Sequence, residues 1–153
     1  MAEPPSLYEW AGGADALERL TTAFYREVVV DELLEPLFGH MDPAHPAHVA
    51  LWLGEVFGGP PAYTDERGGY PHMLRQHLGR SITEPQRRRW VNLLMDAADE
   101  VGLPDDPEFR AAFAGYVEWG SRLALANSQP GAEPPPAAPV PHWGWGVAPP
   151  YDG

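Results

Sequence analysis

The sequence predicts an all-α protein, and three observations support this fold class. Apolar residues recur at helical spacing through most of residues 1–129, no alternating strand pattern lasts beyond a few residues, and glycine and proline fall between the helical segments. With 153 residues, 44% of them hydrophobic, the chain is long enough for one well-packed core. We therefore expect one helical domain over residues 1–129, followed by an extended tail over residues 130–153 that holds eight of the 19 prolines.

The first half of the chain predicts short helices separated by glycine and proline. Residues 7–11 are long enough for one helical turn, which the Gly12-Gly13 pair ends. A second helix is predicted to begin near Asp15, with an apolar stripe of Leu17, Leu20, Phe24 and Val28. Residues 31–38 predict a short helix interrupted by Pro36, and residues 39–46 predict a loop.

The second half predicts a helix over residues 47–57, no regular structure over residues 60–71, and a helix of about two turns over residues 71–78. Two longer helices follow, each with a start signal. Thr83 and Gln86 have the spacing of a capping box, with Pro85 in the first turn. Asp106 caps the last helix, with Pro107 at its first position. The inner faces of these two helices are Trp90, Leu93, Leu94, Ala97 and Val101, then Phe109, Phe113, Tyr116, Val117 and Leu123.

Composition excludes several classes of function. The chain has no cysteine, which removes disulfides, thiolate metal sites and cysteine nucleophiles. Its formal charge of −12 argues against nucleic acid and anionic membrane surfaces as partners, because both would repel it. No apolar stretch approaches membrane-spanning length or resembles a secretory signal, so we expect a cytoplasmic protein.

Histidines are the main candidates for chemistry. His77 lies among Met73, Leu74 and Leu78, where it is either a packed neutral imidazole or a ligand that faces a pocket. His40, His45 and His48 are close in sequence, but intervening prolines break the periodicity that a zinc site would need.

Two further segments have alternative interpretations. The arginine run over residues 87–89 is predicted to lie on the solvated face of its helix rather than in a nucleic-acid site. Trp143, Trp145 and Tyr151 make the tail more than a free linker, since exposed indoles gain nothing in water. We expect this tail to dock as a strap, either on the protein's own surface or in a partner's groove.

Three stretches together have the order and separation of a known family. They are "FYREVVVDELLEPLF", "GGPPAYTDERGGYPHMLRQHL" and "ITEPQRRRWVNLLMDAA". Over about residues 7–130 the chain resembles the group II truncated haemoglobins. This resemblance implies a globin-like, truncated two-over-two helical sandwich around haem b, which is iron protoporphyrin IX.

The resemblance also assigns roles to single residues. His77 matches the proximal histidine that binds iron, and Tyr25, Trp90 and His45 fall on the distal side of the haem. The remaining matched haem contacts are Phe38, His48, Val49, Tyr63, Leu74 and Arg75. Three positions depart from the family pattern: Phe38 replaces a frequent tyrosine, His45 a frequent small residue, and Gln76 the arginine that commonly precedes the proximal histidine.

These roles imply binding of oxygen, carbon monoxide and nitric oxide by a monomer or homodimer. Donors that hold oxygen tightly favour redox chemistry, such as nitric oxide oxidation or peroxidase-like activity with electrons from a reductase, over storage. Two alternatives stay open at this point. One is a biosynthetic haem enzyme that acts on an organic substrate, and the other is a haem-free globin-like interaction module.

Overall fold

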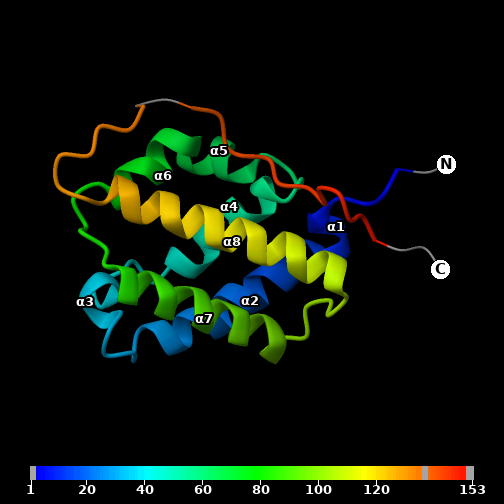
Figure 1. The fold of residues 1–153 in the computed structure, drawn as a ribbon, viewed down its shortest axis with the longest axis horizontal. Coiled ribbons are helices and arrows are strands. Elements are labelled where there is room, and N and C mark those ends of the chain that lie inside the picture. Colours follow the sequence, from blue (N-terminus) through cyan, green and yellow to red (C-terminus); the bar gives the residue numbers. More distant parts are fainter. Residues whose placement is uncertain (1–2, 136–137, 151–153) are drawn as a thin grey trace.

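The computed structural model describes residues 3–135 and 138–150, and all regular structure within these ranges is helical. The predicted fold class is therefore confirmed. Figure 1 shows the helices in chain order. They are α1 (Leu7–Ala11), α2 (Gly13–Val28), α3 (Glu35–Phe38), α4 (His45–Val56), α5 (Ala62–Arg67), α6 (Gly69–His77), α7 (Glu84–Glu100) and α8 (Pro107–Asn127).

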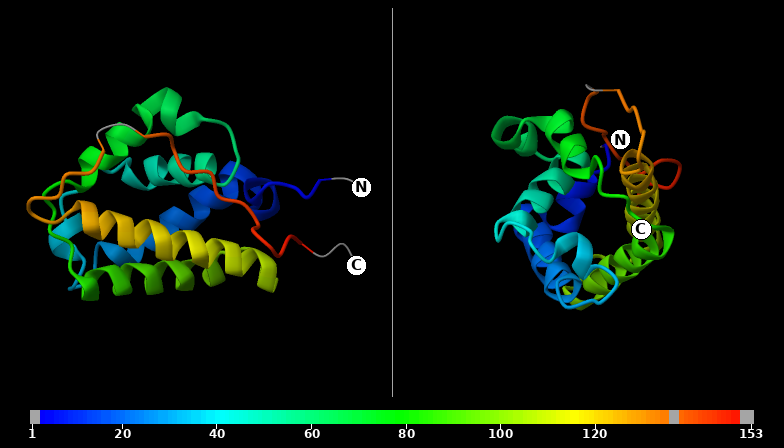
Figure 2. Two further views of the ribbon diagram at one scale, coloured as in Figure 1. Left: turned by 45° about the horizontal axis from the view of Figure 1, so that its top comes forward. Right: turned by 90° about the vertical axis from the view of Figure 1, so that its left-hand side faces the viewer.

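The long helices form two packed pairs. Helix α2 packs closely on α4, α7 packs on α8, and α2 also contacts α7 and so joins the two pairs. The end-on view in Figure 2 shows α2 and α4 on one side of the molecule and α7 and α8 on the other. The short helix α6 is arranged differently, because it packs mainly against α5 and α8.

The core lies between the pairs and is rich in phenylalanine. Phe24, Phe57, Phe109 and Phe113 are almost completely buried. One buried hydrogen bond crosses the core, from the indole N–H of Trp52 on α4 to the hydroxyl of Tyr116 on α8, at 2.8 Å. A buried indole N–H or tyrosine hydroxyl needs a hydrogen-bond partner, and this bond fixes α4 and α8 relative to each other.

The predicted helix starts of α7 and α8 are confirmed. Thr83 and Gln86 form both bonds of a capping box. The Asp106 side chain accepts a bond from the Phe109 N–H at 2.9 Å. Each cap satisfies N–H groups that the first helical turn leaves without partners.

Three predicted boundaries were wrong. Helix α3 covers only Glu35–Phe38 rather than residues 31–38, and Pro36 lies in its first turn instead of interrupting it. Helix α4 begins at His45, inside the expected loop, because Pro46 is tolerated in a first turn. Helix α5 lies within residues 60–71, where no regular structure was expected. The buried carboxylate of Glu55 supplies its missing cap: Oε1 accepts from the Thr64 N–H at 2.8 Å, and Oε2 accepts from the Thr64 hydroxyl. This cap comes from α4, so local sequence does not reveal it.

The prediction that residues 87–89 are all solvated was wrong for Arg87, which is 5% exposed. Its guanidinium donates to Glu84, one turn earlier, and to Glu118 and Ser121 on α8. Since these contacts satisfy most of its donors, the charge is tolerated inside the α7–α8 interface. Arg88 is exposed, as predicted.

The tail lies on the protein's own surface. The backbone N–H of Trp143 donates to the Val56 carbonyl at 2.8 Å, and the Trp145 indole donates to the Pro5 carbonyl at 2.7 Å. Val140 is buried against the core. Figure 1 shows the tail, in orange and red, returning past α8 towards α1. Tyr151, the third aromatic residue of the expected strap, lies outside the described residues. The boundary between a helical domain over residues 1–129 and a tail over residues 130–153 stays a prediction.

Candidate functional site

Three predicted distal residues lie in one cluster. The Tyr25 hydroxyl of α2 lies 3.1 Å from His45 Nε2 of α4, and the Trp90 side chain of α7 is close enough to lower the pKa of Tyr25. Phe38 completes the cluster, with its ring centroid 5.8 Å from that of Tyr25 and 6.1 Å from that of His45. Four elements that are separate in the sequence thus meet at one polar group.

Burial controls the protonation of this cluster. Burial raises the pKa of Tyr25, and the nearby Trp90 side chain opposes this shift only in part. Burial also lowers the pKa of His45 to about 4, and electrostatic interactions with the nearby His48, His77 and Arg80 lower it further. At neutral pH His45 is therefore uncharged, and its Nε2 can accept a hydrogen bond from the Tyr25 hydroxyl.

His77 lies at the end of α6 and is partly buried. Burial lowers its pKa, while a hydrogen bond to the Met73 backbone carbonyl opposes the shift. The imidazole is thus neutral at pH 7, so one of its two ring nitrogens carries no proton. A neutral imidazole held in this way is the form that binds iron.

The surroundings of His77 fit a flat apolar group. Several large apolar side chains near the site are only partly buried although they pack on the core: Phe38, Met41, Val49, Tyr70, Met73 and Trp90. Leu74 beside them is buried. His77 contributes to the electrostatic environment of His45, so the two imidazoles lie in one region although α6 packs mainly on other helices.

A second cluster carries positive charge. Burial raises the pKa of Tyr63 to about 12, and the positive charges of Arg67 and Arg75 oppose this shift. Burial lowers the pKa of His72, and Arg67, Arg75 and His48 lower it further. Within the described ranges, Arg67 and Arg75 form no ion pair with a carboxylate, and the buried Nε of Arg67 has no hydrogen-bond partner. An orphaned buried donor beside unpaired cations fits a ligand with carboxylates, as haem has.

Sequence reasoning missed two members of this cluster. Arg67 was overlooked because α5 was not expected, and the helix is what places it near His72. The 3.4 Å contact between an Arg67 guanidinium nitrogen and His72 Nε2 shows this proximity. His72 was overlooked because its spacing of five residues from His77 puts it on another face of α6.

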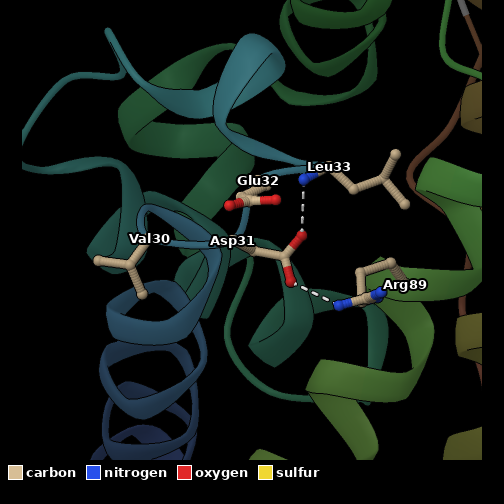
Figure 3. A pocket seen from close by; sticks show the side chains of 5 residues that line it. All are labelled: Val30, Asp31, Glu32, Leu33 and Arg89. Carbon is tan, nitrogen blue, oxygen red and sulfur yellow. Dashed lines mark hydrogen bonds and ion pairs between the residues drawn. The ribbon is translucent and has the colours of Figure 1, made fainter.

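A surface pocket at the corner between α2, α3 and α7 carries no comparable chemistry. Figure 3 shows its lining residues, where the Asp31 carboxylate accepts a bond from the Leu33 N–H and pairs with Arg89. The Arg89–Asp31 distance is 2.8 Å. This pair ties the chain after α2 to α7, and no histidine lines the pocket.

The described part of the chain offers no other metal site. It contains no group of three or more histidine, cysteine, aspartate or glutamate side chains arranged to hold a metal ion. The zinc alternative for His40, His45 and His48 therefore has no support. None of the helices in residues 3–135 and 138–150 is long and apolar enough to cross a membrane.

The two-over-two helices, the neutral histidine on α6 and the aromatic distal cluster define a protein of the truncated-globin class. Comparison with known proteins agrees. Residues 6–113 match the bacterial-like globin family. A group 2 truncated hemoglobin of Bacillus subtilis is 33% identical over 117 residues, which cover 76% of this chain and 86% of that protein.

Solved structures give the same result. A truncated oxygen-avid haemoglobin from Bacillus subtilis has a TM-score of 0.70 at 30% identity, over 79% of this chain and 99% of that one. A hemoglobin from Chloroflexus aurantiacus also has a TM-score of 0.70, at 29% identity, over 79% and 98% of the two chains. The chain belongs to the bacterial-like globin family, and its resemblance to the group II truncated haemoglobins is confirmed.

Family membership supplies the cofactor and the general activity. The chain takes haem b and binds oxygen and other diatomic ligands. This result favours the predicted haem protein over the haem-free interaction module. The neutral histidine, the partly buried apolar side chains and the unpaired arginines are the features of this chain that fit haem.

Proposed function

We propose that this globin uses haem for redox chemistry on nitric oxide or peroxide rather than for oxygen storage. The observation that carries the proposal is the 3.1 Å contact between the Tyr25 hydroxyl and His45 Nε2, with Trp90 close enough to affect the pKa of Tyr25. A cluster of hydrogen-bonding groups in an aromatic surround can retain a bound ligand. Storage instead requires ready release.

Each part of the site has a role in this proposal. When bound, haem supplies an iron centre that takes diatomic ligands and exchanges electrons. His77 would hold the iron through the unprotonated nitrogen of its neutral ring. His48, Tyr63 and Arg75 would hold the propionates, with Arg67 and His72 beside them. Val49, Phe38 and Leu74 would exclude water from the haem faces.

The distal side chains would position the ligand through hydrogen bonds. Tyr25 and Trp90 donate hydrogen bonds, which favour ligands that develop negative charge. His45 is uncharged at neutral pH, so its Nε2 can accept a hydrogen bond from the Tyr25 hydroxyl, which keeps its proton because burial raises its pKa. Electrons would come from a reductase. That partner, the cytoplasmic location and the oligomeric state stay predictions.

The first test of the proposal is spectroscopic. Purified protein supplied with haem should show a stable Soret band and a histidine-ligated carbon monoxide spectrum. His77→Ala should lose or alter both. His40→Ala is the matched control, because His40 is exposed in the loop after α3, and it should behave as the wild type does. An unaltered spectrum in His77→Ala would remove His77 as the iron ligand.

The second test separates redox chemistry from storage. The oxygenated protein is mixed with nitric oxide, and nitrate formation is compared with spontaneous oxygen release. Redox function predicts that nitrate forms faster than oxygen leaves, and that Tyr25→Phe changes the balance. Rapid oxygen release without nitrate formation would support storage instead.

A further inference from the structure

A continuous line of aromatic side chains connects the predicted haem contact Tyr63 with the protein surface. The ring centroids of Tyr63 and Trp52 lie 5.1 Å apart, and the Trp52 indole donates to the Tyr116 hydroxyl at 2.8 Å. Tyr116 lies 5.5 Å from Trp143, and Trp143 lies 5.6 Å from Trp119. We name these five residues the aromatic relay.

The aromatic relay runs from the interior to solvent. Tyr63, Trp52 and Tyr116 are 2%, 7% and 7% exposed, Trp143 is partly buried, and Trp119 is 42% exposed. Its members come from α5, α4, α8 and the tail. The order of burial therefore follows the order of the contacts.

Packing alone does not explain the outer end of the aromatic relay. An exposed indole on the outer face of α8 contributes little to a core, and neither Trp119 nor Trp143 uses its indole N–H in a hydrogen bond to the described residues. The pair Trp10 and Trp145 differs, because both indoles donate, to Asp106 and to the Pro5 carbonyl. Those two indoles serve as anchors, whereas Trp119 and Trp143 keep only their rings in contact.

We propose that the aromatic relay carries single electrons from Trp119, where small phenols are oxidised at the surface, to haem that a peroxide has oxidised. This inference rests on the proposed haem site and redox function. It adds a substrate class and a second site of reaction, remote from the distal cluster, with Trp119 as the residue that contacts the phenol.

The electron balance of the proposed reaction is complete. One hydrogen peroxide takes two electrons and two protons and becomes two waters, which leaves the haem group two electrons short. Trp119 returns one electron at a time and releases its indole proton to solvent. A phenol then gives one electron and one proton to the Trp119 radical and becomes a phenoxyl radical. Two phenols and one peroxide thus yield two phenoxyl radicals and two waters.

The residue types suit these steps. Burial raises the pKa of both Tyr63 and Tyr116 to about 12, so their hydroxyls keep their protons at neutral pH. An indole can lose an electron before it loses its proton, so the oxidised residue is a tryptophan radical cation rather than a tyrosine radical. Solvent at the exposed Trp119 accepts the released proton, whereas the buried Trp52 indole N–H donates to the Tyr116 hydroxyl and does not reach solvent.

The test uses the full chain loaded with haem b. Hydrogen peroxide is added with a nitroso spin trap, freeze-quenched samples are measured by electron paramagnetic resonance, and trapped residues are located by peptide mass spectrometry. The aromatic relay predicts a tryptophan radical and an adduct on Trp119. Trp119→Phe should lose this adduct and most phenol oxidation, while the Soret change caused by peroxide keeps its wild-type rate. Trp119→Tyr should restore phenol oxidation.

Trp145→Phe is the matched control, since it changes a tail tryptophan outside the aromatic relay and should leave the Trp119 adduct in place. An adduct confined to Tyr25 or Tyr63, or unchanged phenol oxidation in Trp119→Phe, would overturn the inference. Its failure is distinct from failure of the proposed function. A Soret band that responds to peroxide without a radical at Trp119 refutes the relay alone, whereas a wild type that retains no haem refutes both.

Discussion

Replacement of Tyr116 by phenylalanine tests the bond that joins the two helix pairs. The change removes one hydroxyl and leaves the ring in contact with Phe57 and Trp143 at centroid distances of 5.5 Å. It also leaves the Trp52 indole N–H, in a side chain that is 7% exposed, without its partner. A buried donor left unpaired costs about 1–3 kcal/mol, so we expect the free energy of unfolding to fall by that amount.

The assay is urea denaturation followed by circular dichroism at neutral pH. The midpoint should fall while the dependence on urea stays constant, because the surface exposed on unfolding is unchanged. In a thermal scan, each kcal/mol corresponds to about 2–4 °C for a chain of this size. Tyr8→Phe is the control, since Tyr8 is partly buried and its hydroxyl makes no hydrogen bond within the described residues.

A double-mutant cycle isolates the bond itself. Trp52→Phe removes the donor and also some volume, so it should cost more than Tyr116→Phe. The double variant should be more stable than the sum of the two single changes predicts, by about 1 kcal/mol. Strict additivity, or a Tyr116→Phe variant within about 0.5 kcal/mol of the wild type, would refute the reasoning that this bond ties α4 to α8.

Four further predictions concern other parts of the molecule. Burial raises the pKa of Tyr116 from 10.0 to about 12, so the unfolded state ionises first; stability is complete below pH 10 and should decline as the pH rises towards 12, as alkaline melting curves can show. Arg87→Met should lower the urea midpoint, since buried bonds between α7 and α8 are lost, whereas the exposed Arg88→Met should change it little. Tyr25→Phe should speed oxygen dissociation roughly tenfold in stopped-flow measurements, the effect of one lost hydrogen bond of about 1.4 kcal/mol; an unchanged rate would exclude Tyr25 as a ligand donor. Val140→Asp should release the tail, so that limited proteolysis trims it faster than in the wild type; equal rates would show that Val140 does not hold the tail.

The helices that the sequence predicted well are those whose signals are local. The bonds between Thr83 and Gln86 form within one turn, so the residue types and their spacing are sufficient to place the start of α7. The same is true of Asp106 at the start of α8. Apolar spacing likewise placed Leu17, Leu20 and Phe24 in the core, because one face of a helix must be buried.

The features that the sequence did not predict depend on partners from distant elements. Glu55 on α4 caps α5, and no residue near Thr64 replaces it. Arg87 appeared to belong to a solvated run until Glu118 and Ser121 on α8 were found around it. A side chain's burial depends on what packs over it, and this is not encoded in its own helix.

The candidate site, too, was predicted from the sequence only in part. Residue types and their order were sufficient to indicate a globin, a histidine for iron and a set of aromatic donors, because these follow from periodicity, spacing and family resemblance. Only the tertiary structure decided that the hydroxyl of Tyr25 meets His45, that Arg67 lies beside His72, and that Trp143 of the tail lies on Tyr116. The physical reason is that hydrogen bonds and aromatic contacts require atoms a few ångströms apart, and those distances are set only when the helices and the tail pack together.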